Sequence, residues 1–308
     1  MPAGGFFIVD TLILKLGATG DVVRTTPLLR CLPGRVSWVT AAKNVPLLTG
    51  ATDHVRCVAW EQRALFADRP YDLVINLEDT LEAGRFVQTL RCDRVFGASL
   101  GADDSLGYSD DARGWFDLSL ISRLGKTEAD RLKLGNRRSY QDLVFAGLDL
   151  VFQGEKYLLP EPVETGLVGD VALSPLAGPV WPMKNWAGYP ALQAELEHAG
   201  LRVNILPERP TLLEHLGDVA GHHCLVSGDS LPMHLALGLG VHCVTLFTCT
   251  SPWEIHDYGL QHQIISPLLT EFFYQRGRDA RAVTAIPVDE VLDAVIRQLG
   301  APVSQPHA

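Results

Sequence analysis

The feature that most constrains the fold of this chain is a short apolar run that leads through a glycine-containing turn into helical spacing. Leu12–Leu16 predicts a buried strand, and the pattern breaks at Gly17 and Gly20 before Asp21 opens a helix. Glycines between a strand and a helix let a ligand approach the backbone closely, at the sheet edge where open α/β proteins bind ligands. The turn lacks the third glycine of a dinucleotide fingerprint and the lysine of a phosphate loop. It therefore presents an acid, and phosphate-binding groups must be sought elsewhere.

Strand-like and helix-like segments alternate through the first hundred residues. The predicted strand and helix pairs are Phe6–Leu16 with Asp21–Leu32, Val36–Thr40 with Asn44–Leu48, Val55–Trp60 with Glu61–Ala67, and Leu73–Leu77 with Leu81–Leu90, followed by a strand at Arg94–Phe96. Such alternation predicts βαβ units and a parallel sheet with helices on both faces. Residues 98–138 lose this regularity, and we interpret them as a long irregular insertion over the sheet edge. Helical spacing returns at Tyr140–Leu148.

A second alternating block follows a predicted linker at Gln153–Gly169. Its predicted strands are Val171–Ser174, Val203–Leu206, Cys224–Ser227 and Val244–Phe247, and its predicted helices are Tyr189–His198, Thr211–Val219, Pro232–Leu239 and Ile286–Leu299. A chain of 308 residues suits two domains of about 150 residues each. We therefore expect an α/β protein of two Rossmann-like domains, residues 1–160 and 161–308, which face a central cleft with the carboxyl ends of their strands.

Composition limits the partners and the compartment. A net charge of −10 argues against nonspecific nucleic-acid binding and against strong attraction to an anionic membrane. No apolar run approaches the roughly 18 residues of a membrane span, although peripheral membrane association stays open. The amino terminus lacks the features of a signal peptide, and six cysteines without a Cys-x-x-Cys pair are typical of reduced thiols. We expect a cytoplasmic protein.

In the second half, polar residues follow several predicted strands. Ser174 is followed by Lys184 near the start of a helix, where a lysine and free backbone N–H groups suit phosphate oxygens. A surface lysine beside a core tryptophan, Trp186, explains this pattern equally well. Glu208 follows the next strand, where an acid often holds a ribose diol, although a lone turn glutamate is more often merely solvated.

Asp229, Ser230 and His234 form the strongest polar cluster. Asp229 or Ser230 can cap the helix that follows, which is the structural interpretation. Ser230 and the first backbone N–H groups would also form an anion site, with His234 one turn further along. The spacing alone does not separate these two roles.

Three further groups are weaker candidates. His222–Cys224 carries atoms that could bind a metal, but neighbouring strand residues point to opposite faces, so we expect no metal site. The serines lack the Gly-x-Ser-x-Gly context of a hydrolase. Glu78 and Asp79 end a predicted strand and could face the cleft, although a capped helix start at Asp79 or Thr80 is more common.

In their order and spacing, these motifs resemble those of glycosyltransferase family 9, the heptosyltransferase-like enzymes with the GT-B fold. The resemblance runs from about residue 11 to residue 298. Leu14–Arg30 is similar to the family's first motif, in which Asp21 matches the proposed catalytic base. Lys184 lies in a stretch like the Lys-x-Trp-Pro element that meets the donor diphosphate. Asp229–His234 is similar to the Asp-Thr-Gly-x-x-His element at the nucleotide, and Leu246–Pro252 to Leu-Phe-Gly-x-Thr-x-Pro.

The chain also departs from the family pattern. Leu231 replaces the glycine of Asp-Thr-Gly, and Thr248-Cys249 replaces Gly-Pro, so the backbone approach to the donor phosphates is altered. The chain is more similar to a subgroup of the family that has an Asp-Thr-Leu-x-Met-His motif and a later Glu-Ile-x-x-Tyr motif. The later motif is matched here by Trp253–Tyr258. That subgroup carries a following cysteine cluster, whereas Ser266–Arg278 has no cysteine.

The resemblance implies a metal-independent, inverting transfer of a sugar to a hydroxyl of a glycan, protein or small molecule. The donor that it implies most strongly is ADP-heptose. Asp21 would act as the base, and no cofactor is expected. The implied donor-binding residues are Ser174, Lys184, Glu208, Asp229, Ser230 and His234, and the implied acceptor-side loop contains Gly17, Thr19 and Gly20.

Two other functions stay open at this stage. The altered positions Leu231 and Thr248-Cys249 fit a binding or scaffold protein that has kept the fold without catalysis and partners a glycosylation enzyme. A two-lobed sugar-nucleotide epimerase would need catalytic acids in both lobes and no acceptor.

Overall fold

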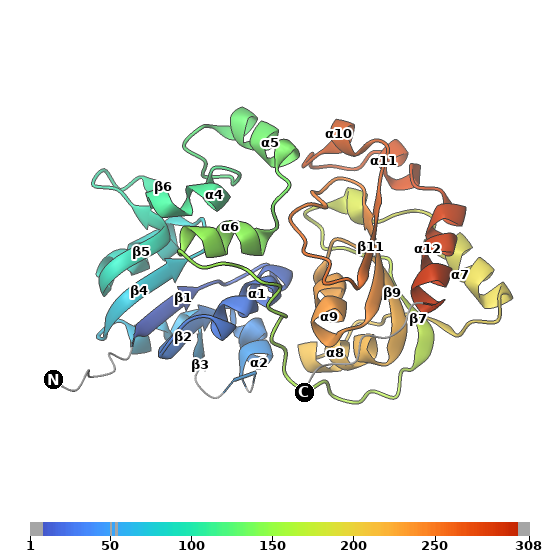
Figure 1. Cartoon of the computed structure of the whole chain (residues 1–308), viewed down its shortest axis with the longest axis horizontal. Helices are drawn as coiled ribbons and strands as arrows, with labels where there is room; N and C mark the ends of the chain where they lie inside the picture. Colours follow the sequence, from blue (N-terminus) through green and yellow to red (C-terminus); the bar gives the residue numbers. More distant parts are fainter. Residues whose placement is uncertain (1–8, 50, 53–54, 301–308) are drawn as a thin grey trace. The chain divides into compact units, whose positions relative to one another are not determined.

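The computed structural model describes residues 9–49, 51–52 and 55–300, and these form two compact units (Figure 1). Unit 1 comprises the described residues up to Lys133 together with Tyr140–Pro160, and unit 2 comprises Leu134–Ser139 and the described residues from Glu161 onward. Each unit contains a mainly parallel sheet with helices on both faces. The predicted α/β class with two parallel-sheet domains is confirmed.

In the sheet of unit 1, the order in which the chain adds strands reverses between two central strands. Its strands are β1 (Asp10–Leu14), β2 (Arg35–Thr40), β3 (Val55–Ala59), β4 (Pro70–Asn76), β5 (Arg91–Leu100) and β6 (Leu106–Tyr108). The spatial order is β3-β2-β1-β4-β5-β6, with β6 antiparallel to β5. The chain winds from β1 to one side and then returns to β4 on the other, so a topological switch point lies between β1 and β4.

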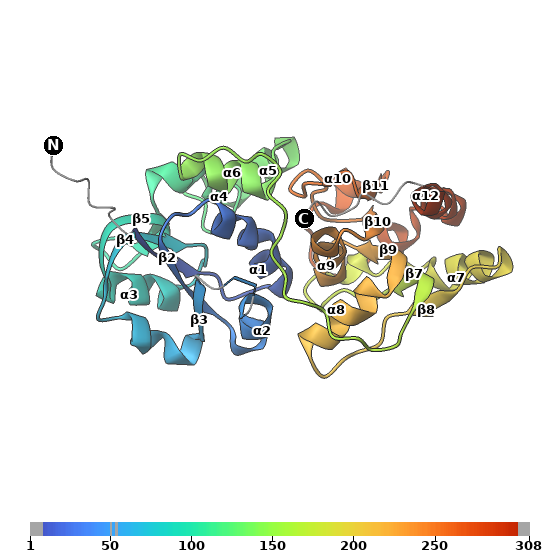
Figure 2. The ribbon, with the colours of Figure 1, turned by 60° about the horizontal axis from the view of Figure 1, so that its bottom comes forward.

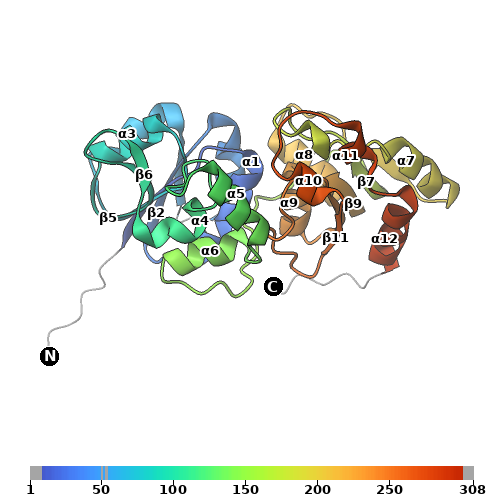
Figure 3. The same ribbon diagram turned by 90° about the horizontal axis from the view of Figure 1, so that it is seen from above.

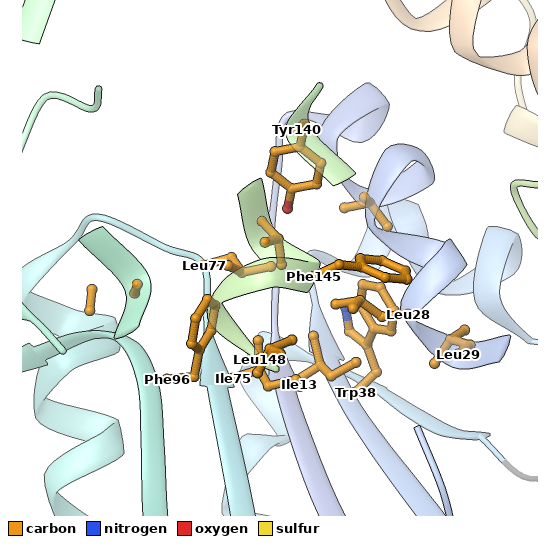
Figure 4. Packing of buried hydrophobic residues seen from close by; sticks show 14 of the residues in the cluster. Ile13, Leu28, Leu29, Trp38, Ile75, Leu77, Phe96, Tyr140, Phe145 and Leu148 are labelled. Atoms are coloured by element: carbon orange, nitrogen blue, oxygen red, sulfur yellow. The ribbon is translucent and has the colours of Figure 1, made fainter. Parts of the chain in front are cut away.

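Helices cover both faces of this sheet. The helical segments of unit 1 are α1 (Thr19–Thr25), η1 (Thr26–Arg30), η2 (Ala42–Asn44), α2 (Val45–Leu48), η3 (Trp60–Phe66), α3 (Leu81–Thr89), η4 (Asp110–Ala112), α4 (Arg113–Phe116), α5 (Lys126–Gly135, which runs into unit 2) and α6 (Tyr140–Gly147). Figure 2 shows α6 and α3 on opposite sides of the strands. The core beneath α1 and α6 contains Ile13, Trp38 and Phe145, with Leu77 and Tyr140 in the same cluster (Figure 4).

The first strand and helix are shorter than the sequence predicted. Phe6–Ile8 of the predicted strand lie outside the described residues, and β1 ends at Leu14. The helix starts at Thr19, two residues early, and tightens into a 3₁₀ turn at Thr26. Pro27 lacks a backbone N–H, so it cannot continue the α-helical hydrogen-bond ladder.

The expectation of an irregular segment at residues 98–138 was wrong. This segment completes β5 and contains β6, α4 and α5. Elements of three or four residues are too short to show a period, and α5 buries only Ala129, so it has little apolar stripe.

Unit 2 has a second parallel sheet with its own switch point. Its strands are β7 (Gly169–Ser174), β8 (Val203–Ile205), β9 (His222–Gly228), β10 (His242–Phe247) and β11 (Gln261–Ile265), in the order β11-β10-β9-β7-β8. The switch point lies between β7 and β9, because β8 lies on the other side of β7. The β11 strand was not predicted, because its sequence, Gln-His-Gln-Ile-Ile, begins with three polar residues.

The helices of unit 2 also lie on two faces. They are η5 (Pro182–Lys184), α7 (Tyr189–His198), α8 (Leu212–Ala220), α9 (Leu231–Leu239), α10 (Leu269–Phe272), α11 (Ala280–Thr284) and α12 (Val288–Gly300). Seen from above, α7 and α12 lie on one side of the strands and α8 and α9 on the other (Figure 3). In the part of the chain that the structure describes, no helix has the length and apolar content needed to cross a membrane.

Candidate functional site

Unit 1 contains a pocket of about 230 Å³ at the switch point of its sheet. The residues that line it follow β1 and β4 or come from the part of the chain that runs from α4 to the start of α6: Lys15, Gly17, Asp21, Arg24, Leu77, Glu78, Asp79, Trp115, Phe116, Ser119, Leu120, Lys133 and Tyr140. Parallel α/β sheets bind ligands at such a point. This pocket is therefore the candidate site of unit 1.

Asp21, the acid predicted from the glycine turn, lies in this pocket. Its Oδ1 is 2.8 Å from a guanidinium nitrogen of Arg24, and its Oδ2 accepts a hydrogen bond from the Ala18 N–H at 3.2 Å. The second contact also stabilises the start of α1. With 32% of its side chain exposed, Asp21 is oriented by two contacts and still open to a ligand.

Arg24 is held by aromatic residues that are remote in the sequence. The centre of its guanidinium lies 4.3 Å from the Tyr140 ring centroid and 5.3 Å from that of Trp115. The Tyr140 hydroxyl lies 2.7 Å from Thr25 Oγ1, which donates to the Asp21 carbonyl. Helix α6 thus fixes the surroundings of Asp21.

A buried ion pair lies beside Asp21. Lys15 Nζ is 2.8 Å from Glu78 Oε1 and donates to the Leu77 carbonyl at 3.3 Å, and the same Glu78 oxygen accepts from the Leu16 N–H. Burial lowers the pKa of Lys15, but the nearby Asp21 and Glu78 carboxylates raise it by more than burial lowers it. The pKa of Lys15 therefore lies above its usual value. Lys15 was not predicted as a site residue, although a lysine inside an apolar strand pattern was an available signal.

Glu78 and Asp79, which follow β4, have different surroundings. Thr80 caps α3, since its Oγ1 accepts from the Ala83 N–H, as the structural interpretation expected. Glu78 joins the ion pair, and Asp79 is exposed and lines the pocket.

The predicted acceptor-side loop is only partly at the pocket. Gly17 lines it, and a Cβ at this position would meet no atom within 4 Å. The Gly17–Ala18 peptide bond is cis. Thr19 donates to Asn44 Oδ1 at 2.8 Å and is buried, and Gly20 is buried within α1. The space comes from Gly17, whereas Thr19 and Gly20 build the turn.

In unit 2, Lys184 and Asp229 form a tight pair. Lys184 Nζ donates to Asp229 Oδ2 at 2.9 Å and to the Asp229 backbone oxygen at 2.5 Å. Their side chains are 11% and 17% exposed, so Lys184 is not the surface lysine of the structural interpretation. Trp186 is a core residue whose indole N–H donates to the Ile286 carbonyl.

Asp229 is ionised in this setting. Burial raises its pKa, but the charges of Lys184 and His234 outweigh burial and lower the pKa to about 2. The pair holds the Lys184 ammonium at the end of β9. Within the described residues both acceptors of Lys184 Nζ belong to Asp229, so one of the three ammonium N–H groups is left for a ligand or solvent.

The start of α9 lies directly after this pair. Ser230 is the N-cap residue, but its side chain makes no capping hydrogen bond and instead donates to the Gly228 carbonyl at 3.2 Å. The predicted cap is therefore absent. The uncapped helix N-terminus suits an anion, with His234 buried one turn further in.

Gly228 permits a close contact between β9 and the Lys184 segment. A Cβ at this position would lie 3.1 Å from the Lys184 carbonyl oxygen and 3.4 Å from Lys184 Cβ. The first distance is tighter than most real contacts, so a larger residue would displace Lys184.

The substituted loop after β10 supports the same segment. Thr248 is fully buried, and its hydroxyl donates to the Met183 carbonyl at 2.7 Å. Cys249 is also buried, and its carbonyl accepts from the Tyr274 N–H. The departures from Gly-Pro thus pack behind Lys184.

Ser174 and Glu208 lie on neighbouring strands. Ser174 is the last residue of β7 and pairs in register with Ser227 of β9, so it lies at the switch point with Asp229. Glu208 is exposed in the loop after β8, on the other side of β7. The structure thus gathers Ser174, Lys184 and Asp229 near one point, with Glu208 one strand away.

The His222–Cys224 segment alternates as a strand should. His222 is buried and bonds to the Asp218 carbonyl through Nδ1, whereas the His223 side chain is 74% exposed. Among the residues that the structure describes, no three His, Cys, Asp or Glu side chains are grouped for a metal ion.

One protein-family model matches the second half of the chain. Residues 180–272, which include Lys184 and Asp229, match the family model of glycosyltransferase family 9 (heptosyltransferase). No match was found among curated proteins.

Solved structures share the fold over nearly the whole chain. A glycosyl transferase of family 9 from Veillonella parvula is 15% identical with a TM-score of 0.66, covering 94% of this chain and 97% of its own. The E. coli heptosyltransferase WaaC with ADP-2-deoxy-2-fluoro heptose is 14% identical, with a TM-score of 0.58 and coverage of 94% and 99%. The E. coli ADP-heptose lps heptosyltransferase II is 18% identical, with a TM-score of 0.57 and coverage of 94% and 98%.

At these identities the structural matches establish the fold, and the family model carries the classification. The shared fold is the GT-B fold of two parallel-sheet domains that the motifs implied. The match at residues 180–272, within a chain of this fold, confirms the resemblance to glycosyltransferase family 9 and identifies the protein as a glycosyltransferase.

Proposed function

We propose that this chain transfers a heptose from ADP-heptose to an acceptor hydroxyl, with inversion and without a metal ion. The observation that carries the proposal is the Lys184–Asp229 pair at the uncapped start of α9. A fixed ammonium and a helix N-terminus together match the charge of a diphosphate. The E. coli heptosyltransferase WaaC, which has a similar fold, has been solved with ADP and with ADP-2-deoxy-2-fluoro heptose, which supports the choice of nucleotide.

In this proposal unit 2 binds the donor. The remaining N–H of Lys184 and the backbone N–H groups of Leu231 and Met233 stabilise the leaving diphosphate, since Pro232 between them has no N–H. The Ser230 hydroxyl joins them once it turns away from the Gly228 carbonyl, and Asp229 keeps Lys184 in place. Because these groups supply positive charge, the reaction needs no metal to offset the charge that develops on the leaving group. Ser174 and Glu208 complete the donor site, with Glu208 at the ribose.

Unit 1 provides the base. Asp21 takes the proton from the acceptor hydroxyl as that oxygen attacks the anomeric carbon and the bond to the diphosphate breaks. Attack on the face opposite the leaving group inverts the configuration. Arg24 holds the carboxylate while Gly17 leaves room for the acceptor.

Calorimetry with the full chain tests the donor assignment. We expect ADP to bind at least about tenfold more tightly than UDP, and a Lys184→Met variant to lose most of that affinity. The matched control is Lys126→Met, because Lys126 is an exposed lysine in unit 1. Tighter binding of UDP, or unchanged ADP binding in Lys184→Met, contradicts the donor assignment.

Product analysis tests the reaction. The full chain is incubated with ADP-heptose and a cell extract that contains candidate acceptors, and mass spectrometry should show a heptosylated product. The yield of this product should be the same when a metal chelator is added. Loss of transfer in the chelator contradicts metal independence. Binding without transfer favours the scaffold function, and a changed sugar without an acceptor favours the epimerase.

A further inference from the structure

The proposed mechanism uses Asp21 and leaves the buried Lys15–Glu78 pair beside it without a role. Both residues line the pocket of unit 1, and their side chains are each 10% exposed. Buried charges are retained at a cost in solvation unless they are well paired and hydrogen-bonded. A charged pair at the wall of a ligand pocket, next to the proposed base, is a candidate for ligand recognition.

The pair still has one donor and one acceptor to offer. Within the described residues, Lys15 Nζ donates to Glu78 Oε1 and the Leu77 carbonyl, which leaves one of its three N–H groups. The contacts of Glu78, to Lys15 and the Leu16 N–H, are both made by Oε1, which leaves Oε2. A sugar hydroxyl both donates and accepts, so two neighbouring hydroxyls match this pair.

The charges around the pocket argue against an anionic ligand. Three cationic residues line it, Lys15, Arg24 and Lys133, and three acidic residues line it as well, Asp21, Glu78 and Asp79. Lys15 and Arg24 are already within 2.8 Å of a carboxylate oxygen of Glu78 and Asp21. A ligand carboxylate or phosphate would be repelled by the three acidic side chains. The three basic side chains only balance these acids, so they leave no net positive charge for an anionic ligand.

The remaining wall suits the apolar face of a sugar ring. Trp115 lines the pocket and is partly exposed, and Leu120 at its rim is 74% exposed. Pockets of this kind combine an aromatic wall with a few placed polar groups that set orientation.

We propose that the acceptor presents an uncharged sugar unit to this pocket and that Lys15 and Glu78 bind two of its hydroxyl groups beside Asp21. The inference rests on the proposed transferase function, because it names the acceptor class of that same site. Lys15 donates to one hydroxyl oxygen, and Glu78 accepts from the neighbouring hydroxyl. The base then meets a hydroxyl that is already oriented.

The direct test is binding of matched probes to the full chain in the presence of ADP. The probes are p-nitrophenyl glycosides of glucose, galactose and mannose, each paired with the corresponding uronide, which adds one carboxylate. Saturation-transfer NMR titrations should show that at least one neutral glycoside binds about tenfold or more tightly than its uronide. Equal or tighter binding of the uronides, or no binding of any neutral glycoside, overturns the inference.

Variants assign the effect to the pair. The double variant Lys15→Met/Glu78→Met removes both charges at similar volume, so no buried charge is left alone. We expect it to keep ADP binding and to weaken the neutral glycoside about tenfold. The matched control is Arg63→Met/Glu82→Met, since this ion pair of unit 1 lies outside the pocket-lining residues. A Lys15→Met/Glu78→Met protein that binds the neutral glycoside as the wild type does overturns the assignment.

A second, milder variant guards against a folding defect. Glu78→Gln keeps an oxygen for Lys15 and Leu16, and it should also weaken the neutral glycoside while thermal unfolding stays cooperative. Because glycoside binding is measured without transfer, its outcome is separate from that of the donor and product experiments. Loss of transfer with intact discrimination between glycosides and uronides counts against the proposed reaction alone.

Discussion

Lys184 donates to both the carboxylate and the backbone carbonyl of Asp229, at 2.9 and 2.5 Å, so a single acidic residue fixes the direction of its ammonium group. This pair joins the loop before α7 to the end of β9, two segments that are 45 residues apart. The contact is therefore both a structural link and the centre of the proposed donor site. Its two roles lead to separable predictions.

The pair makes stability depend on pH. The pKa of Asp229 falls from 3.8 to about 2, because Lys184 and His234 outweigh the opposing effect of burial. A lowered folded-state pKa gives stability that is present above the unfolded value and lost as the pH falls through the folded value. At neutral pH this contribution is on the order of 2 kcal/mol.

We expect Asp229→Asn to unfold more easily than the wild type at pH 7, and the difference to shrink between about pH 4 and pH 2. Denaturant titrations at several pH values measure it. Asp293→Asn, an exposed carboxylate on α12, is the control and should differ little from the wild type at any pH. A difference for Asp229→Asn that stays constant with pH contradicts the ion-pair account.

Gly228→Ala should weaken donor binding through Lys184. The added methyl group would lie 3.1 Å from the Lys184 carbonyl oxygen, so the segment must shift. We expect ADP affinity to fall roughly tenfold and stability to fall by about 1–3 kcal/mol, as for other overpacked sites. Calorimetry and thermal unfolding measure the two effects.

Gly178→Ala is the matched control for this steric change, since a Cβ at Gly178 meets no atom within 4 Å. Its ADP affinity should equal that of the wild type. Equal losses in both variants would show that Gly228 has no special contact with Lys184.

A second prediction on stability concerns Asp218, which is fully buried in α8. Its carboxylate accepts two hydrogen bonds from Arg209, at 2.6 and 2.7 Å, and one from Thr165. Burial raises the pKa of Asp218, but the bonds from Arg209 and Thr165 outweigh it, so the pKa lies below its usual value.

Because Asp218→Asn removes the charged acceptor of the bonds from Arg209 and Thr165, it should cost about 1–3 kcal/mol at neutral pH. Chemical denaturation measures the loss, and ADP binding of the folded fraction should be unchanged. A loss below about 1 kcal/mol would mean that Arg209 finds enough solvent to replace the carboxylate.

Long elements with a clear period were predictable from the sequence. The β7, α7 and α9 segments lie within about two residues of their predicted bounds, because their apolar residues alternate or repeat with the period of one face. The α5 helix and the β11 strand were missed, since α5 has only one fully buried residue and β11 begins with polar residues.

The candidate sites were predictable only where chain order sets position. Ser174 ends one parallel strand and Asp229 follows another, so their place at one sheet edge was expected, and Asp21 follows β1 in a similar way. The contact of Arg24 with Tyr140 depends on how α1 and α6 pack, 116 residues apart in the sequence, and no local pattern encodes it. Lys15 and Glu78 follow the neighbouring strands β1 and β4, so chain order gives their edge of the sheet, whereas their ion pair was not predicted.

The central claim is that Asp21 is the base of a transferase, and Asp21→Asn tests it most directly. Asparagine keeps an oxygen for the Ala18 N–H but cannot accept the proton of an attacking hydroxyl. Asp79→Asn changes another carboxylate of the same pocket and serves as the control. Transfer of heptose from ADP-heptose is followed by mass spectrometry, with ADP binding measured in parallel.

The account predicts that Asp21→Asn lowers kcat by roughly a hundredfold or more while ADP binding and thermal unfolding stay near those of the wild type. Asp79→Asn should keep most of the activity. An Asp21→Asn protein that transfers heptose at a rate close to that of the wild type would contradict the account.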